Sequence, residues 1–131
     1  MGLSIREICA MYQERSNKYY RKPSGRPTRE ASNVHDSMRA LLVVYPEMPA
    51  CELRAKHLRV LQEYMATGTC DLDHAPDIKP VSRTTINARI RRIMRMIRWA
   101  AEYEYVPDDQ PHRLSILSPL KPGRTTALEH P

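Results

Sequence analysis

The chain has 131 residues, and its 21 Lys and Arg against 15 Asp and Glu give a formal net charge of +6. This length fits one domain with a modest core, and 27% charged residues is ordinary for a globular protein. No apolar stretch reaches membrane-spanning length, and the charged N-terminus does not read as a signal peptide. Three scattered cysteines suit a reducing cytoplasm. Composition therefore excludes the secreted, membrane and disordered classes.

Eleven prolines divide the chain into windows, because proline is poorly tolerated inside a helix. The first window predicts a helix at about 5–21, which begins with Ser4 and Glu7 at capping-box spacing. One face of this helix carries the residues expected in the core, which are Ile5, Ile8, Cys9, Tyr12 and Tyr19.

A second helix is expected at about 29–45, with Thr28 as its N-cap and Pro46 ending it. A third is expected at about 54–66, with Gly68 as its C-terminal cap. Both carry apolar residues at steps of three and four. The acidic segment 69–81 has no helical period, so we expect a mobile loop there.

The fourth helix is expected at about 83–104, with Ser82 as its cap. Its core stripe consists of Ile86, Ile90, Ile93, Ile97 and Ala100. Trp99 lies off this stripe, where it would either pack under the third helix, which we favour, or meet a partner domain. Residues 108–131 read as a tail with one short helix near 110–115. No segment predicts a strand, so the expected fold is an all-α four-helix orthogonal bundle with this short extra helix or an extended tail.

The positive charge is concentrated in two windows. Residues 15–39 hold seven basic residues against two acidic ones, and residues 81–101 hold six arginines and no acid. Such clustering is typical of surfaces that bind the phosphates of duplex DNA. The alternative is a solvated helix face whose acidic partners lie elsewhere in the fold.

Helical geometry places Arg91, Arg95 and Arg98 opposite the isoleucine stripe of the fourth helix. The polar start of this helix combines a positive dipole end with hydroxyl groups, a combination suited to phosphate. Arg83 and Asn87 are residue types that read base edges. The candidate DNA-binding residues are Lys22, Arg26, Thr28, Arg29, Arg83, Thr84, Asn87, Arg91 and Arg95.

The stretch SRTTINARIRRIMRMIRWAAEYEYVP (82–107) resembles the last helix of the N-terminal core-binding domain of phage integrases and other tyrosine site-specific recombinases. The similarity lies in Thr85-Ile86-Asn87, Trp99-Ala100 and Val106-Pro107, with Ile97 where an aromatic residue is usual. Residues 4–28 resemble the first helix and loop of that domain in a bacterial integrase subgroup. The stretch LKPGRTTALEHP (120–131) resembles the linker to the catalytic domain.

The resemblance implies a SAM-like bundle, residues 1–107, that binds attachment-site DNA, followed by a tail and linker, 108–131, toward a missing catalytic domain. The implied partners are double-stranded DNA, the catalytic domain of the same polypeptide and other recombinase protomers, with no membrane. The chain contains no His-x-x-Arg box, which that catalytic domain needs, so we expect no enzymatic activity of its own. The implied location is the cytoplasm, on the bacterial nucleoid when bound.

Two alternatives come from the residues themselves. Small helical bundles also bind proteins, so the arginine face would suit an acidic protein partner. Cys70 and His74 lie near three aspartates but lack the spacing of a four-ligand metal site. No glycine-rich phosphate loop is present either, so we expect no metal and no cofactor.

Overall fold

The structure, a computed structural model, describes residues 2–19 and 29–122. Over these residues the chain forms five α-helices and no strand, which confirms the all-α class. The helices are α1 (Ile5–Tyr19), α2 (Arg29–Val44), α3 (Ala55–Thr67), α4 (Arg83–Glu102) and α5 (Gln110–Leu114). The bounds of α2 to α5 lie close to those expected, because prolines and caps mark the ends of helices. The expected end of the first helix, at residue 21, lies outside the described residues.

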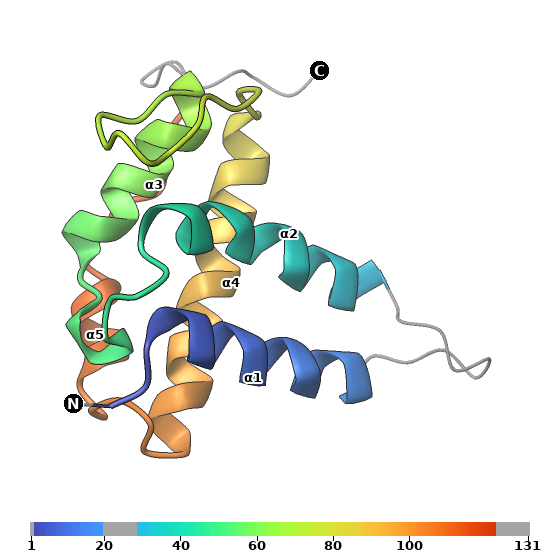
Figure 1. The fold of residues 1–131 in the computed structure, drawn as a ribbon, viewed down its shortest axis with the longest axis vertical. Coiled ribbons are helices and arrows are strands. Elements are labelled where there is room, and N and C mark those ends of the chain that lie inside the picture. The colour runs from blue at the N-terminus through green and yellow to red at the C-terminus, as the bar shows by residue number, and fades with distance from the viewer. Residues whose placement is uncertain (1, 20–28, 123–131) are drawn as a thin grey trace.

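Helices α1 and α2 lie side by side and antiparallel, and α4 crosses behind both of them (Figure 1). Helix α3 packs against α2 and α4, while the short α5 packs against α3 and α4. The longest helix, α4, therefore contacts every other helix of the bundle and forms its centre. No described helix has the length and apolar character needed to cross a bilayer.

Helix ends follow the expected capping chemistry. The Ser4 backbone N–H donates to Glu7 Oε1 at 2.9 Å, and the Glu7 N–H donates to Ser4 Oγ at 3.2 Å. Gly68 closes α3 in the left-handed region with φ of 83°, and a Cβ at this position would collide with the carbonyl oxygen of Ile78. A 3₁₀ turn over Ala50–Glu52 precedes α3 and was not expected from the sequence. The expected N-cap of α2, Thr28, lies outside the described residues.

The core consists of the faces that helical spacing predicts. All five residues of the α4 stripe are at most 4% exposed, and Ile5 and Ile8 of α1 are fully buried. Leu53, in the turn before α3, is also fully buried. Burying such side chains provides about 1.5–3 kcal/mol each and holds α4 at a fixed rotation. That rotation decides which arginines of α4 face outward.

Two aromatic residues lie elsewhere than expected. Tyr19 was expected in the core but is 70% exposed at the last residue of α1. Its ring instead lies under the Arg15 guanidinium, with 4.5 Å between the guanidinium carbon and the ring centroid. Trp99 packs against Tyr12 of α1, with ring centroids 5.3 Å apart, and not under α3. Helical phase gives the face of a residue but not the helix that covers it.

The segments expected as a mobile loop and a tail are both attached to the bundle. In the loop, the Val81 N–H donates to the Met65 carbonyl at 3.0 Å, and the Tyr64 hydroxyl donates to the Pro76 carbonyl at 2.5 Å. In the tail, Leu114 is fully buried, and the Gln110 amide donates to the Ala50 carbonyl at 2.6 Å. The packed part of the described chain therefore continues past the boundary expected after residue 107.

The three cysteines differ in burial, which predicts different reactivity. Cys9 lies in the core at 4% exposure, and burial raises the pKa of its thiol to about 12. Cys51 and Cys70 are partly exposed free thiols. Because the thiolate is the reactive form, we expect iodoacetamide at pH 8 to modify Cys51 and Cys70 and to leave Cys9 intact until the chain unfolds. Mass spectrometry of native and urea-treated protein measures this difference, and equal labelling of all three residues would contradict it.

A histidine at the start of α3 makes stability dependent on pH. The Arg54 backbone N–H donates to His57 Nδ1 at 2.9 Å, which requires this nitrogen to be unprotonated. Burial lowers the pKa of His57, and the charges of Lys56 and Arg54 lower it further, against a small opposite effect of Glu52. The folded state therefore binds the proton more weakly than the unfolded chain, whose histidine pKa is about 6.5.

It follows that the stabilising cap is fully present above pH ~6.5 and is lost as the pH falls through the folded-state pKa. We expect urea unfolding of the wild type to show a loss of stability between pH 7.5 and 5 that His57→Gln does not share. Glutamine at this position keeps a cap acceptor without titrating. Parallel pH profiles for the two proteins would contradict this role.

Candidate functional site

The six arginines of α4 fall into two groups of different burial. Arg91, Arg95 and Arg98 are exposed and form, with Thr84, the outer strip of α4 on the side opposite its core stripe. Arg83, Arg89 and Arg92 are partly buried. The predicted opposition of arginines and isoleucines is therefore present in the structure. With a rise of about 1.5 Å per residue, the outer strip extends over roughly 20 Å.

The start of α4 is capped by its own hydroxyl groups. Ser82 Oγ accepts the Thr85 backbone N–H at 3.4 Å, and the two side-chain oxygens lie 2.9 Å apart. Both hydroxyls thus serve the helix terminus, which is the capping role expected for them. Thr84 is exposed, with its hydroxyl oxygen 3.4 Å from Ser82 Oγ. It is the hydroxyl at this helix end that remains accessible to a ligand.

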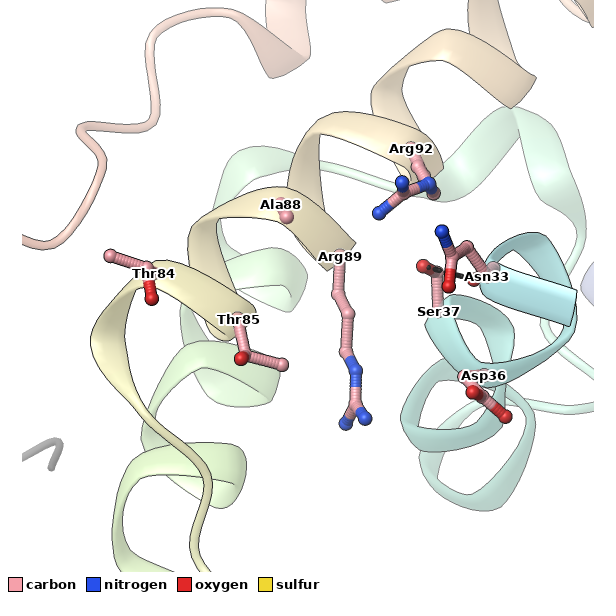
Figure 2. A pocket seen from close by; sticks show the side chains of 8 residues that line it. All are labelled: Asn33, Asp36, Ser37, Thr84, Thr85, Ala88, Arg89 and Arg92. Carbon is pink, nitrogen blue, oxygen red and sulfur yellow. Dashed lines mark hydrogen bonds between the residues drawn. The ribbon is translucent and has the colours of Figure 1, made fainter. Parts of the chain in front are cut away.

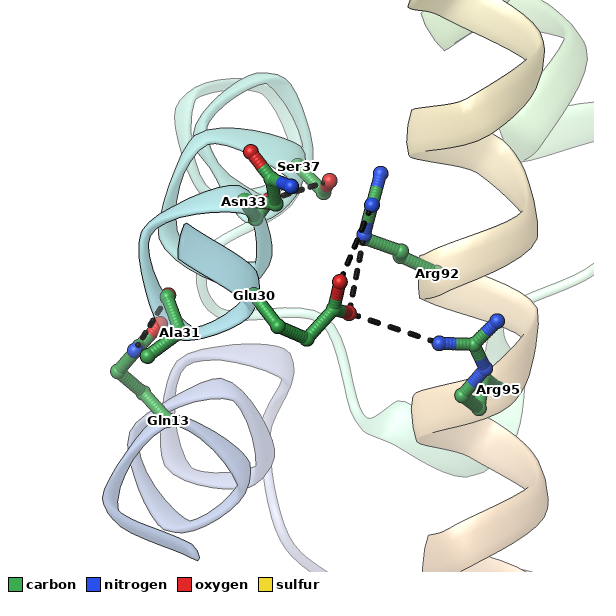
Figure 3. Close-up of polar contacts among 7 residues, drawn as sticks. All are labelled: Gln13, Glu30, Ala31, Asn33, Ser37, Arg92 and Arg95. Carbon is green, nitrogen blue, oxygen red and sulfur yellow. Dashed lines mark hydrogen bonds and ion pairs between the residues drawn. The ribbon is translucent and has the colours of Figure 1, made fainter. Parts of the chain in front are cut away.

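Two arginines of α4 share one carboxylate (Figure 3). Arg92 binds both oxygens of Glu30, with its Nε 3.2 Å from Oε2 and its Nη2 3.3 Å from Oε1. The guanidinium of Arg95 approaches the same Oε2 at 3.6 Å. The side chains of Glu30 and Arg92 are 29% and 21% exposed, whereas that of Arg95 is 59% exposed. Arg92 therefore connects α4 to the start of α2, while Arg95 retains most of its surface.

The side-chain amide of Asn87 is hydrogen-bonded to the tail. Its amide nitrogen donates to the Leu120 carbonyl at 3.0 Å, and its amide oxygen accepts the Leu120 N–H at 2.9 Å. This pair of bonds uses the same donor and acceptor that a base edge would need. The candidate base-reading role of Asn87 thus competes with a contact that holds residues after α5 against α4. Only displacement of the tail would release the amide.

A polar groove of about 300 Å³ lies between α2 and α4 (Figure 2). The side chain of Arg89 extends into it from α4, with Asn33, Asp36 and Ser37 on the facing side of α2. Burial lowers the pKa of Arg89, the carboxylate of Asp36 raises it, and the charge of Arg39 lowers it again. An arginine remains charged under these conditions, so the groove contains a cation with reduced hydration.

The remaining candidates belong to the first basic window. Arg29 is exposed at the start of α2, next to the Glu30 that binds α4. Lys22, Arg26 and Thr28 lie outside the described residues. The contact of Glu30 with α4 places the start of α2, where Arg29 lies, against α4.

Three residues of this surface were missed as site residues. Glu30 lies in the first turn of α2, where an acidic residue is favourable for the helix itself, but it pairs with residues more than sixty positions away. Arg89 and Arg98 belong to the basic window 81–101 but are not among the candidate DNA-binding residues. No local sequence pattern identifies the pairing of Glu30 with Arg92, because the two residues are distant in sequence. The helical phase of Arg98, in contrast, predicts its place in the outer strip.

The aspartate-rich segment after α3 does not gather metal ligands. His74 Nε2 lies 3.0 Å from the Val44 carbonyl oxygen, a contact that attaches the segment to the end of α2. Within residues 2–19 and 29–122, no three His, Cys, Asp or Glu side chains come together as a metal site requires.

Known protein families, curated proteins and solved structures show no significant match to this chain. The functional assignment therefore depends on the residues and geometry of the chain itself.

Proposed function

We propose that this chain is a DNA-binding domain of the core-binding type, which places a separate catalytic domain of a tyrosine recombinase or integrase on attachment-site DNA. The observation that carries the proposal is the outer strip of α4, in which Arg91, Arg95 and Arg98 follow one another along one exposed face. Glu30 pairs with Arg92 and Arg95, whereas Arg91 and Arg98 form no ion pair with the described residues, so the outer strip keeps most of its positive charge.

Electrostatics makes a nucleic acid the best complement of this strip. Duplex DNA carries one negative charge per about 1.7 Å of its axis, so a strip of roughly 20 Å meets several phosphates at once. The rigid guanidinium fork binds phosphate oxygens in pairs. Thr84 in the first turn of α4 and Arg29 at the start of α2 are exposed and add further donors. Phosphate contacts of this kind supply affinity and orientation, while sequence reading needs base edges.

The residues divide into roles within this proposal. Arg91, Arg95, Arg98, Thr84 and Arg29 bind phosphates. Arg83, at the start of α4, is the candidate for contacts to base edges. Lys22, Arg26 and Thr28 complete the interface from the segment between α1 and α2. Asn87 holds the tail, and Arg92 holds α2.

The alternative partner is an acidic protein. The Glu30 contact favours an acidic protein partner, because guanidinium groups of α4 already bind a carboxylate in this fold. Such a partner would use a few well-placed Asp or Glu side chains against the same outer strip.

A mobility-shift experiment separates the two proposals. The protein is mixed with candidate attachment-site duplex or random duplex at 50 and 200 mM salt, with polyglutamate as a competitor. We expect retarded duplex at low salt, weaker retardation at high salt, and a preference for the attachment site. No retardation at 50 mM salt, combined with capture of polyglutamate, would favour the acidic protein partner instead.

A further inference from the structure

Arg89 lines a second cavity besides the polar groove. It has a volume of about 260 Å³ and lies between α2, α3, α4 and the segment that precedes α4. The apolar part of its lining, called the floor below, includes Val43, Met65, Ile78 and Val81. Tyr64 adds its ring, while the Tyr64 hydroxyl donates to the Pro76 carbonyl. The cavity therefore has a surface suited to hydrocarbon.

The rim of this cavity is positively charged. Arg39 comes from α2, Lys79 from the segment before α4, and Arg89 from α4, so three separate elements each provide one cation. None of these three side chains forms a hydrogen bond or ion pair with the described residues. Asp36 acts on Arg89 only as a nearby charge. The charge of Asp77 likewise acts on Tyr64 of the lining, so three cations stand against two carboxylates and leave a net positive charge beside the apolar floor.

We propose that this cavity binds a small organic carboxylate, with its anionic group among Arg39, Lys79 and Arg89 and its apolar body on the floor. A planar carboxylate matches the guanidinium fork, and an apolar chain removes the floor from water. A cavity of about 150 Å³ holds a benzene ring, so this one accommodates a chain of about six carbons or a substituted ring. A DNA phosphate would pair with the three cations but would leave the apolar floor exposed to water.

Isothermal titration calorimetry of the whole chain, without DNA, tests the proposal. The probes are hexanoate and benzoate, compared with hexanol and inorganic phosphate at equal ionic strength. We expect saturable binding of the two carboxylates at about 0.1–1 mM, and weaker binding of hexanol and phosphate, because each of these supplies only half of the interaction. The absence of saturable carboxylate binding would overturn the proposal, as would phosphate binding as tight as hexanoate.

Variants locate the site within the molecule. Arg89→Gln is expected to weaken hexanoate binding about tenfold, since one charge-assisted contact is lost. Val43→Phe is expected to fill the floor and abolish binding, with the helical circular-dichroism spectrum unchanged. Arg59→Gln removes an exposed charge on α3 away from the cavity and should leave binding unchanged. Equal binding by wild type, Arg89→Gln and Val43→Phe would overturn the assignment.

The result of the calorimetric titration does not depend on the proposed DNA function. The calorimetric experiment contains no nucleic acid, and the outer strip of α4 does not line this cavity. If Arg89→Gln weakened duplex binding while no carboxylate bound, the three cations would belong to the DNA surface and the cavity proposal would be wrong.

Discussion

Replacing Arg91 and Arg98 together by alanine is expected to weaken duplex binding about tenfold or more while the fold stays intact. Both side chains are exposed on the outer strip of α4, and neither forms an ion pair with the described residues. Their removal therefore leaves no buried charge without a partner. Alanine also has the highest helix propensity, so the helix itself is not weakened. Fluorescence anisotropy with a labelled duplex at 100 mM salt measures the affinity.

Two control variants make this expectation specific. Arg59→Ala removes an exposed arginine from α3, and it should change affinity little if binding depends on position as well as total charge. Arg92→Ala removes the partner of Glu30, so it should lower the free energy of unfolding by about 1–2 kcal/mol, between the values for exposed and buried pairs. If Arg59→Ala weakened binding as much as each α4 arginine, a defined α4 interface would be ruled out.

Replacing Glu30 by glutamine is expected to move stability and DNA affinity in opposite directions. The carboxylate binds Arg92 with both oxygens and also contacts Arg95. Without its charge, the link between α2 and α4 weakens, and we expect a loss of about 1–2 kcal/mol in urea unfolding. Arg95 is then no longer held by a competing anion, so duplex affinity should rise about threefold to tenfold.

The matched control for this variant is Glu47→Gln. It removes the same charge from a surface pair with Arg6, whose side chains are 62% and 67% exposed, at the opposite end of α2 from Glu30. Neither stability nor affinity should change much, because exposed pairs contribute little. An unchanged or reduced duplex affinity in Glu30→Gln would mean that Glu30 positions Arg95 for its ligand and does not compete for it.

Sequence reasoning predicts the helices well, because their ends are determined locally. Prolines, the Ser4–Glu7 box, Ser82 and Gly68 each act within a few residues, and apolar spacing gives the buried face of each helix. The rotation of α4 follows from its isoleucines. The outer strip could therefore be predicted residue by residue.

Partners distant in sequence could not be predicted in the same way. Glu30 meets Arg92 and Asn87 meets Leu120 only after the helices have packed. Tyr19 has the phase of a core residue but is exposed at the end of α1. The cavity beside Arg89 needs three elements in place before its charges converge. In each case the deciding information is the position of another segment, which local spacing does not contain.

The salt dependence of duplex binding tests the proposed function most directly. A phosphate interface releases counterions, so log K should fall linearly with log salt concentration, with a slope of about −0.9 for each neutralised phosphate. For wild type we expect a slope steeper than about −2.7, corresponding to the three arginines of the outer strip. Arg91→Ala combined with Arg98→Ala should flatten it by about 1.8. A slope near zero, or one that the double substitution leaves unchanged, would contradict DNA binding through α4.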